Sequence, residues 1–223
     1  HFKYNDLDSL DKLLNKYKDN VAAVIMEPMN VEFPKGGFLE NCKKLAHDNN
    51  ALFIFDETIT GFRFSLGGAQ KYFGVTPDLS TFGKGMANGY PISALVGKKE
   101  YMQIMEDVFL SSTFGGESVS IAASLAVIDK FERTNGVAHI HNIGEQIIEK
   151  TKKLIAAYNL DDIISVHGHP CWSFLVIKDY ANYSSWDIKT LFMQECLKRG
   201  LLTFCTHNIS YAYSQNEVDY IEN

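Results

Sequence analysis

A single lysine, Lys84, stands between Gly83 and Gly85 in the sequence TFGKGMANG. Residues 79–91 contain no other charged side chain. A setting of low polarity favours the neutral amine, which is the form that attacks carbonyl groups. Most lysines are solvated surface residues, however, so this position alone does not decide between a reactive amine and an exposed one.

An acidic residue, Asp56, ends the apolar run ALFIFD. Such a run predicts a buried strand that presents its acid at the carboxyl end, the edge at which open α/β sheets bind ligands. The carboxylate could keep a heteroaromatic nitrogen protonated, or it could cap a helix or pair with Arg63. A phosphate-binding loop around Lys84 is excluded because FGKGMANG lacks the GxxxxGK[ST] order.

The segments around these two residues predict a mostly parallel sheet. Apolar residues at helical spacing predict helices over 6–18 and 38–46, and apolar runs predict strands within 21–28 and 51–57. This alternation is typical of parallel strands joined by right-handed crossovers. Further elements are expected at 69–73 (helix), 79–82 (strand), 91–96 (strand, antiparallel at one end of the sheet), 119–131 (helix) and 140–158 (helix).

From about residue 161 the pattern changes. ISVHGHPCWSFLVIKD predicts two strands around a His-Gly-His-Pro turn, and SSWDIKTLFMQECLKRG predicts a helix with Ser184 or Ser185 as its cap and Gly200 as its stop. LLTFCT predicts another strand, and NEVDYIEN predicts the beginning of a helix. We therefore expect part of a large α/β domain over residues 1–158 and a small, incomplete α+β domain over 159–223.

Composition excludes several classes of protein. The 223 residues are 46% hydrophobic and 22% charged, as in ordinary globular proteins. The net charge of -6 argues against nucleic acid or an anionic membrane surface as a partner. No apolar run approaches the roughly 20 residues of a spanning helix, and no signal-peptide pattern is present. These observations predict a cytoplasmic protein.

Neither the cysteines nor the histidines predict a metal site. The cysteines lack CxxC spacing, which favours reduced thiols over disulfides or zinc; they are Cys42, Cys171, Cys196 and Cys205. His139 and His141 are expected at a helix–helix junction, and His167 and His169 in a turn. No matching set of acids or cysteines accompanies either pair, so we predict no metal.

Four motifs are similar, in order and spacing, to those of the class III aminotransferases among the fold type I pyridoxal-phosphate enzymes: VAAVIMEP, IFDETITGFR, PDLSTFGKGMANGYPISALVG and SSTFGGES. FDETITGFR followed by GGAQKYFGVTPDL resembles the glutamate-1-semialdehyde 2,1-aminomutase branch in particular. The resemblance implies a PLP-dependent transferase fold, pyridoxal 5'-phosphate as cofactor and a homodimer with shared active sites. The family's first part, which supplies a phosphate cup and an aromatic ring over the cofactor, is missing from the chain.

The resemblance also implies roles for particular residues. Lys84 matches the lysine that forms a Schiff base with the cofactor and moves the substrate proton, and Asp56 matches the carboxylate that pairs with the pyridinium nitrogen. Thr58 falls where the family places a side chain against the cofactor ring. Thr113, beside Ser112, matches the threonine that reaches the phosphate of the neighbouring subunit's cofactor. Residues expected at the border of the site are Glu27, Asn30 and Ile59, while Glu57 and Arg63 are expected to support it.

These roles imply transfer of an amino group from a small-molecule donor to a carbonyl acceptor. An aminomutase, which moves the amino group within one substrate, is the alternative among enzymes. A catalytically silent, truncated chain is an alternative of another class, motivated by the start at His1 without methionine.

Overall fold

A computed structural model describes residues 1–222, which divide into two compact units. The first unit comprises residues 1–30 and 34–134, and the second comprises residues 31–33 and the chain from 135 onward. The helix α6 (Gly136–Ala157) therefore belongs to the second unit. The domain boundary expected from the sequence, between residues 158 and 159, falls at the end of α6 instead of its start, because α6 packs on the strands that follow it.

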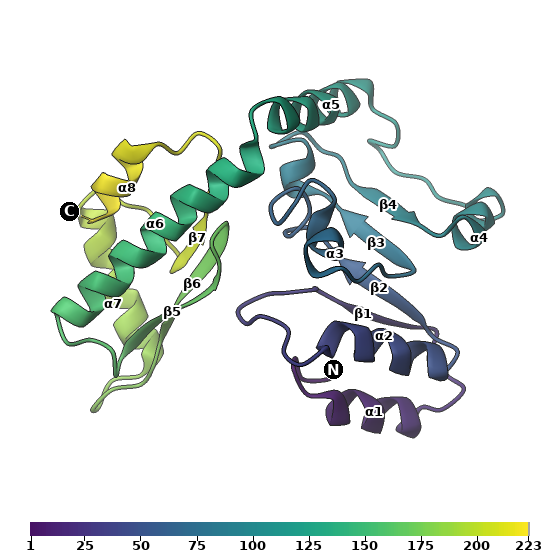
Figure 1. The fold of residues 1–223 in the computed structure, drawn as a ribbon, viewed down its shortest axis with the longest axis horizontal. Helices are drawn as coiled ribbons and strands as arrows, with labels where there is room; N and C mark the ends of the chain where they lie inside the picture. The colour runs from purple at the N-terminus through teal and green to yellow at the C-terminus, as the bar shows by residue number, and fades with distance from the viewer. Residues whose placement is uncertain (223) are drawn as a thin grey trace. The chain divides into compact units, whose positions relative to one another are not determined.

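The sheet of the first unit contains β1 (Ala23–Met26), β2 (Leu52–Asp56), β3 (Leu79–Phe82) and β4 (Ala94–Gly97), in that order (Figure 1). The first three strands are parallel, and β4 is antiparallel to β3. The predicted mixed, mostly parallel sheet is confirmed. The last strand begins at Ala94 instead of Pro91, because Ala94 pairs with Phe82, the final residue of β3.

Two amphipathic helices cover this sheet where the sequence predicts them. Helix α1 (Leu7–Lys16) begins after Asp6, whose carboxylate accepts a hydrogen bond from the backbone N–H of Ser9 at 2.9 Å. Helix α2 (Phe38–Asp48) packs against both α1 and β2 (Figure 1). Their shared core excludes water and includes Leu10, Leu14, Phe38, Leu39, Cys42, Phe53 and Phe55. Burial of this apolar surface supplies most of the free energy that holds the sheet in place.

The remaining helices of the first unit are α3 (Gly68–Phe73), α4 (Lys99–Met102) and α5 (Ser118–Arg133), with short 3-10 turns η1 (Lys84–Met86) and η2 (Gln103–Glu106). Helices α3 and α5 confirm the sequence prediction. At the start of α5, the Glu117 carboxylate accepts hydrogen bonds from two backbone N–H groups, each at 2.7 Å. The two 3-10 turns and α4 are too short to show a hydrophobic period, so the sequence does not predict them.

A buried carboxylate, Asp78, joins three elements of the first unit. Its oxygens lie 2.6 Å from Nζ of Lys98 and 2.7 Å from Nε2 of His47, and they accept the backbone N–H of Phe53 at 2.8 Å. Burial acts to raise the pKa of Asp78, but the bonds from Lys98, Phe53 and His47 outweigh it and lower that pKa to about 2. The carboxylate is therefore ionised in the folded protein at every moderate pH.

Replacing Asp78 with asparagine should lower the free energy of unfolding by about 1–2 kcal/mol at neutral pH. The wild-type contribution is fully present above the ordinary pKa of 3.8 and disappears as the pH falls towards 2, because the folded-state pKa is the lower one. Urea unfolding at several pH values should show that Asp78→Asn flattens this acidic limb. Asp48→Asn, which removes an exposed partner of Lys44, is the matched control and should change little. An acidic limb unchanged in Asp78→Asn would contradict the prediction.

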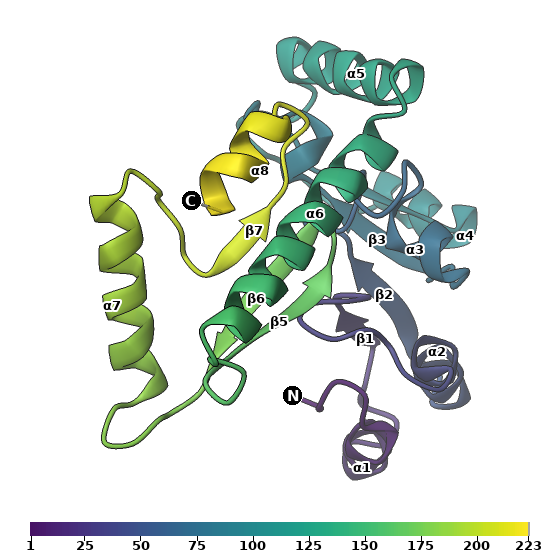
Figure 2. The same cartoon turned by 60° about the vertical axis from the view of Figure 1, so that its left-hand side comes forward.

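The second unit is a three-stranded antiparallel sheet with helices around it (Figure 2). Strands β5 (Ile164–His169), β6 (Trp172–Ile177) and β7 (Thr206–Asn208) are adjacent in this order, and α6 packs on β5 and β6. Helix α7 (Ser185–Lys198) begins after a Ser184–Asp187 capping box, and α8 (Gln215–Glu222) packs on α6. Gly200 has φ +84°, consistent with its predicted role in stopping α7.

Three local predictions for this unit are wrong. His167 and His169 lie in β5, opposite Phe174 and Trp172, so the turn comes later, at residues 170–171. His139 and His141 lie within α6, because the helix junction is at Asn135.

The predicted strand over residues 201–206 is also displaced, since β7 covers 206–208. Cys205 has φ +62°, a left-handed conformation that cannot continue a strand.

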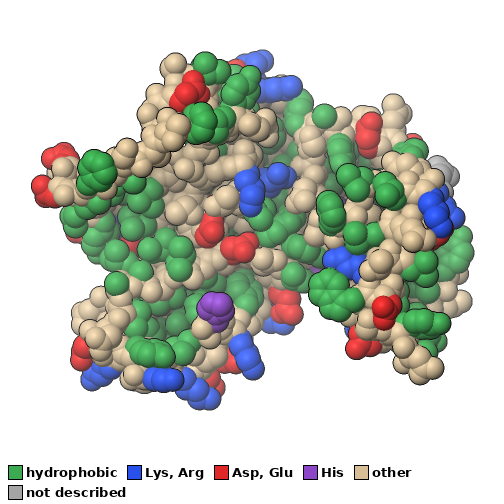
Figure 3. Space-filling model, turned by 180° about the vertical axis from the view of Figure 1, so that it is seen from behind, with side chains coloured by type: hydrophobic (Ala, Val, Ile, Leu, Met, Phe, Trp, Pro, Cys, Tyr) green, Lys and Arg blue, Asp and Glu red, His purple; other side chains and the backbone are tan. Residues whose placement is uncertain are grey.

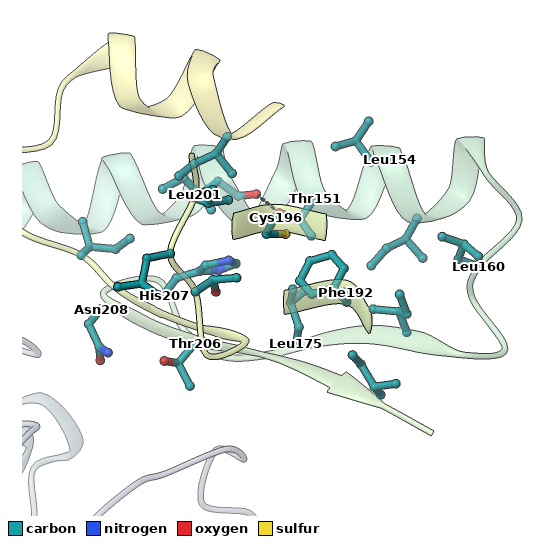
Figure 4. A pocket seen from close by; sticks show the side chains of 18 of the residues that line it. Thr151, Leu154, Leu160, Leu175, Phe192, Cys196, Leu201, Thr206, His207 and Asn208 are labelled. Carbon is teal, nitrogen blue, oxygen red and sulfur yellow. Dashed lines mark hydrogen bonds between the residues drawn. The ribbon is translucent and has the colours of Figure 1, made fainter. Parts of the chain in front are cut away.

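An apolar cavity of about 260 Å³ lies within the second unit, among α6, the sheet and α7 (Figure 4). Side chains such as Leu154, Leu175 and Phe192 line it. The hydroxyl of Thr151, which also lines the cavity, donates its hydrogen bond to the backbone carbonyl of Ile147 at 2.7 Å. None of the predicted active-site residues is among the lining residues, so this cavity is separate from the predicted chemistry.

Among the described residues, no helix combines the length and apolar character needed to cross a membrane. Within the same part of the chain, the four cysteines form no disulfide.

Candidate active site

The carboxyl ends of three parallel strands bring together the acids and the amine that the sequence analysis singled out. Glu27 directly follows β1, Asp56 is the last residue of β2, and Lys84 follows β3 after Gly83. Because β1, β2 and β3 are parallel, these ends share one edge of the sheet. The structure thus confirms that the strand-end acid and the lysine lie at the same edge.

Asp56 is held as an anion by two hydroxyl-bearing residues. Its Oδ1 atom accepts the backbone N–H of Thr58 at 3.0 Å and the hydroxyl of Thr81 at 3.2 Å. Burial raises the pKa of Asp56, but hydrogen bonds from Thr58 and Thr81 and the charge of Lys84 together bring that pKa below its ordinary value. A carboxylate with these partners is well suited to hold a cationic N–H group of a ligand.

Thr81 is a partner of Asp56 that sequence analysis missed. It lies directly opposite Asp56 in the β2–β3 register, and register is not visible in one strand's sequence. Thr81→Val keeps the shape of the side chain but removes the donor. We expect the pKa of Asp56 to rise towards its ordinary value and the protein to lose about 1 kcal/mol of stability.

The measurement is a titration of the Asp56 carboxyl carbon by NMR. Thr76→Val, at an exposed position before β3, is the control and should leave the pKa of Asp56 unchanged. An Asp56 titration that is identical in Thr81→Val and wild type would show that the hydroxyl does not stabilise the anion.

Lys84 begins the 3-10 turn η1 with an exposed side chain and a backbone φ of +41°. The left-handed conformation is unfavourable for a residue with a Cβ atom, and such strain concentrates at functional sites. The charge of Lys84 lowers the pKa of both Asp56 and Glu27. Residues 79–91 carry no other charge, but in the folded protein Lys84 lies near two carboxylates, Glu27 after β1 and Asp56 on β2. Its surroundings are therefore not low in charge.

Glu27 contributes a second, more weakly held carboxylate. Burial raises its pKa and so does the neighbouring Asp56 charge, while Asn30 and Lys84 act in the opposite direction; the net result is a raised pKa. The side-chain amide of Asn30 donates to Oε1 of Glu27 at 3.1 Å. The other oxygen, Oε2, is buried and has no hydrogen-bond partner among residues 1–222. Glu27 and Asn30 thus form a pair at the sheet edge, with one acceptor atom unused.

In the loop after β2, Thr58 lies beside the start of the turn η1, which contains Lys84, and Glu57 anchors α3. A Cβ atom on Gly83 would lie 3.5 Å from the methyl carbon of Thr58, so this threonine packs beside the lysine turn. Ile59 is half-buried in the same loop. Glu57 is fully buried and accepts the Thr60 hydroxyl and the backbone N–H groups of Ala69 and Gln70. Glu57 therefore holds the first turn of α3.

Ser112 and Thr113 are exposed and line a hollow of about 640 Å³ with the segment Pro91–Ser93. Among the described residues, no hydrogen bond or ion pair joins either hydroxyl to Asp56 or Lys84. The structure therefore brings together Asp56, Lys84 and Glu27 but leaves the 112–113 loop apart from them within a single chain.

The fold corresponds to that of solved transaminases. A solved transaminase with PLP bound superimposes with a TM-score of 0.90 over 99% of this chain and 55% of its own, at 20% identity. The FumI protein of Sphingopyxis sp. MTA144, in its PLP internal aldimine form, gives a TM-score of 0.87 at 25% identity over 100% of this chain and 54% of its own.

Residues 3–212 match the class-III aminotransferase family model, and the chain belongs to that family. It is 39% identical over 98% of its length to the 3-aminobutyryl-CoA aminotransferase of Cloacimonas acidaminovorans. It is also 37% identical, over 73% of its length, to the glutamate-1-semialdehyde 2,1-aminomutase of Hyperthermus butylicus. These alignments cover 55% and 40% of the two relatives, so the chain spans about half the length of the curated relatives it matches.

The residues at the sheet edge fit the ring and the carbonyl end of pyridoxal phosphate. Asp56 is an ionised carboxylate suited to a pyridinium N–H, and the exposed amine of Lys84 interacts electrostatically with it. The unused, buried Oε2 atom of Glu27 offers a further acceptor at the same edge. Within residues 1–222, Ser112 and Thr113, the residues expected at the phosphate, line a separate hollow with Pro91–Ser93.

Proposed function

We propose that the protein containing this chain is a pyridoxal-phosphate-dependent enzyme that transfers an amino group to a carbonyl substrate. The observation that carries the proposal is the placement of Asp56 and Lys84 at the ends of adjacent parallel strands, with Asp56 held as an anion. Membership of the class-III aminotransferase family supports the same chemistry.

Each residue has a defined task in this proposal. When bound, the cofactor supplies an electron sink that stabilises negative charge on the substrate carbon beside the amino group. Asp56 keeps a proton on the ring nitrogen, and Thr58 and Thr81 keep Asp56 ionised. The Nζ atom of Lys84 would hold the cofactor through its carbonyl carbon, with loss of water, and would carry the proton to and from the substrate carbon. Thr58, which lies beside Gly83, would contact the ring.

A covalent-labelling experiment tests this function. The protein expressed from its full reading frame, incubated with pyridoxal phosphate, should develop a visible absorbance band. Borohydride should remove the band and leave the mass of the reduced cofactor on the peptide containing Lys84. A label on a different lysine, or the absence of any band in a folded preparation, would refute the proposal.

Transfer to an external acceptor and an internal amino shift are separable by one measurement. Relatives named for both activities match this chain at 39% and 37% identity, so sequence similarity alone does not separate the two. We favour transfer. Amino donors supplied without an acceptor should convert the cofactor to its amine form and release a stoichiometric amount of keto acid. Production of a rearranged amino compound from a single substrate, without keto acid, would instead establish an aminomutase.

The exposed 112–113 loop supports a homodimer in which Thr113 binds the phosphate in the partner's site. Hydrophobic side chains are exposed on the face drawn in Figure 3, and exposed apolar residues flank this loop in the sequence. Phe109, Leu110 and Phe114 are 94%, 75% and 58% exposed, and Leu125 on α5 is 65% exposed. Apolar surface of this kind is typical of a protein interface.

Mixing two inactive variants tests the shared site. Lys84→Ala and Thr113→Ala subunits that exchange should form heterodimers with one site that has both wild-type residues. If half of the dimers are mixed, activity should return to about one quarter of the wild-type value. Mixtures that stay as inactive as the separate variants would place Thr113 in its own subunit's site.

A further inference from the structure

Three side chains of metal-binding type gather in the second unit, and none of them belongs to the strand-edge site of the first unit. They are His141 on α6, His169 at the end of β5 and Cys171 in the turn before β6. One ligand atom from each lies within 4.8 Å of the other two. The Sγ atom of Cys171 is 3.0 Å from Nδ1 of His169, and the two imidazole centroids are 4.6 Å apart.

The close approach of α6 to the β5–β6 turn creates this cluster. At Gly144 a Cβ atom would lie only 1.8 Å from the backbone oxygen of Pro170, so no larger residue fits without movement of the backbone. His141 precedes Gly144 by three residues and therefore lies on the same side of the helix. The contact places His141 over the turn that contains Cys171. Two backbone segments position the ligands, in contrast to an accidental group of mobile surface side chains.

Burial gives the cluster an enclosed side and an open side. Cys171 is 0% exposed and His169 is 1% exposed, whereas His141 is partly exposed. The backbone N–H of Cys171 donates to Nδ1 of His169 at 3.3 Å, so the lone pair of this nitrogen faces the cysteine. A metal ion could enter past His141 and reach a nitrogen and a sulfur that are shielded from water.

We propose that His141, His169 and Cys171 bind one zinc ion, with water as the fourth ligand. Two imidazoles and one thiolate match the preference of Zn²⁺ for nitrogen and sulfur ligands. Ordinary Zn–N and Zn–S bonds at a tetrahedral angle need an N···S separation of about 3.5 Å. The 3.0 Å contact between Nδ1 of His169 and Sγ of Cys171 must therefore open slightly, and the hydrogen bond from the Cys171 backbone N–H to Nδ1 must break, because that nitrogen has one lone pair to give to the ion. On binding, the cysteine S–H bond breaks, the thiolate binds the ion and the proton passes to solvent.

The bound ion would connect α6 to the β5–β6 turn, and its expected effect is on the second unit alone. The proposal does not depend on the function of the strand-edge site, because none of that site's residues takes part. It replaces the prediction of no metal made from the sequence, which considered each histidine pair separately. In the folded chain, His141 from one pair and His169 from the other lie together with Cys171.

Cobalt(II) is the probe for this site, since it replaces zinc and gives a near-ultraviolet charge-transfer band when a thiolate binds it. The protein from its full reading frame, freed of metal by a chelator, should develop this band with one equivalent of Co²⁺ and lose it when Zn²⁺ is added. Cys171→Ser should abolish the band. His141→Gln, at the partly exposed ligand, should weaken Co²⁺ binding at least about tenfold.

Cys196→Ser is the matched control, because Cys196 is a partly buried cysteine of the same unit that lies on α7. It should retain the full band. A wild-type protein with no charge-transfer band would overturn the proposal, as would a band that disappears in Cys196→Ser and persists in Cys171→Ser. If Cys171→Ser fails to fold, undiminished Co²⁺ affinity in folded His141→Gln would also overturn it. Circular dichroism reports the folding of each variant.

Discussion

Replacing Lys84 with alanine should reduce amino transfer by at least about 10⁴-fold, because one side chain supplies both the covalent bond to the cofactor and the proton carrier. The variant should also lose the borohydride-dependent label. Turnover of a saturating donor, measured by release of keto acid, is the readout. Lys99→Ala is the control, since Lys99 is also exposed and lies only fifteen positions further along the chain. Residual turnover within tenfold of the wild type would remove Lys84 from the proposed role.

Two inactive variants of Lys84 should differ in stability. Lys84 has φ +41°, where glycine is unstrained and alanine is not. Lys84→Gly should therefore be about 1 kcal/mol more stable to urea than Lys84→Ala, although both are inactive. Equal stability of the two variants would mean that the backbone at residue 84 is not strained. The comparison separates the cost of the turn geometry from the chemistry of the amine.

Elements whose apolar faces are set by local spacing could be predicted from the sequence. Helices α1 and α2 and strands β1 to β3 appear within a few residues of their expected positions. The apolar runs that end in Glu27 and Asp56 correctly predicted strands with acids at their carboxyl ends. Parallel pairing then followed from the alternation of helices and strands, because the short connections leave few other topologies.

Features that depend on distant backbone segments could not be predicted in this way. The apolar face of α6 can be recognised from its helical spacing, but the sheet that covers it cannot; α6 groups with the second unit by its contacts, whereas the expected boundary lies at the end of α6. The strand after α7 was displaced because nothing in LLTFCT marks the left-handed backbone of Cys205. His169 was placed in a turn because its neighbours are glycine and proline, yet it pairs with Trp172.

The candidate site shows the same division between local and long-range information. Asp56 and Lys84 were found because each stands in a distinctive local setting. Thr81 was missed because its importance comes only from lying opposite Asp56 in the sheet. The interaction of Lys84 with Glu27 was missed for a similar reason, since these residues are far apart in the sequence and meet at the sheet edge. A residue whose role depends on its partner in a neighbouring strand can be recognised only when the fold is known.

Asp56→Asn should lower amino transfer by about 10²–10³-fold while leaving the label on Lys84 intact. The amide retains an oxygen for the Thr58 N–H, so the loop after β2 should keep its structure, but it carries no negative charge to hold a proton on the ring nitrogen. The lowered pKa of Asp56 means that the carboxylate is ionised throughout the neutral and weakly acidic range. The stabilisation that Asp56 contributes is present above the ordinary value of 3.8 and is lost only as the pH falls through the lowered folded-state pKa.

The decisive comparison is between covalent labelling of Lys84 and turnover of the amino donor, each measured at several pH values. Wild type and Asp56→Asn should label Lys84 to the same extent, whereas only the wild type should turn over rapidly. Asp48→Asn, which also removes one carboxylate of the first unit but from an exposed position on α2, should match the wild type in both assays. Rapid turnover by Asp56→Asn would show that a charged partner for the ring nitrogen is unnecessary. If Asp56→Asn loses both the label on Lys84 and turnover, Asp56 instead maintains the structure of the site. A purely electrostatic role would slow the reaction but leave the bond to Lys84 intact.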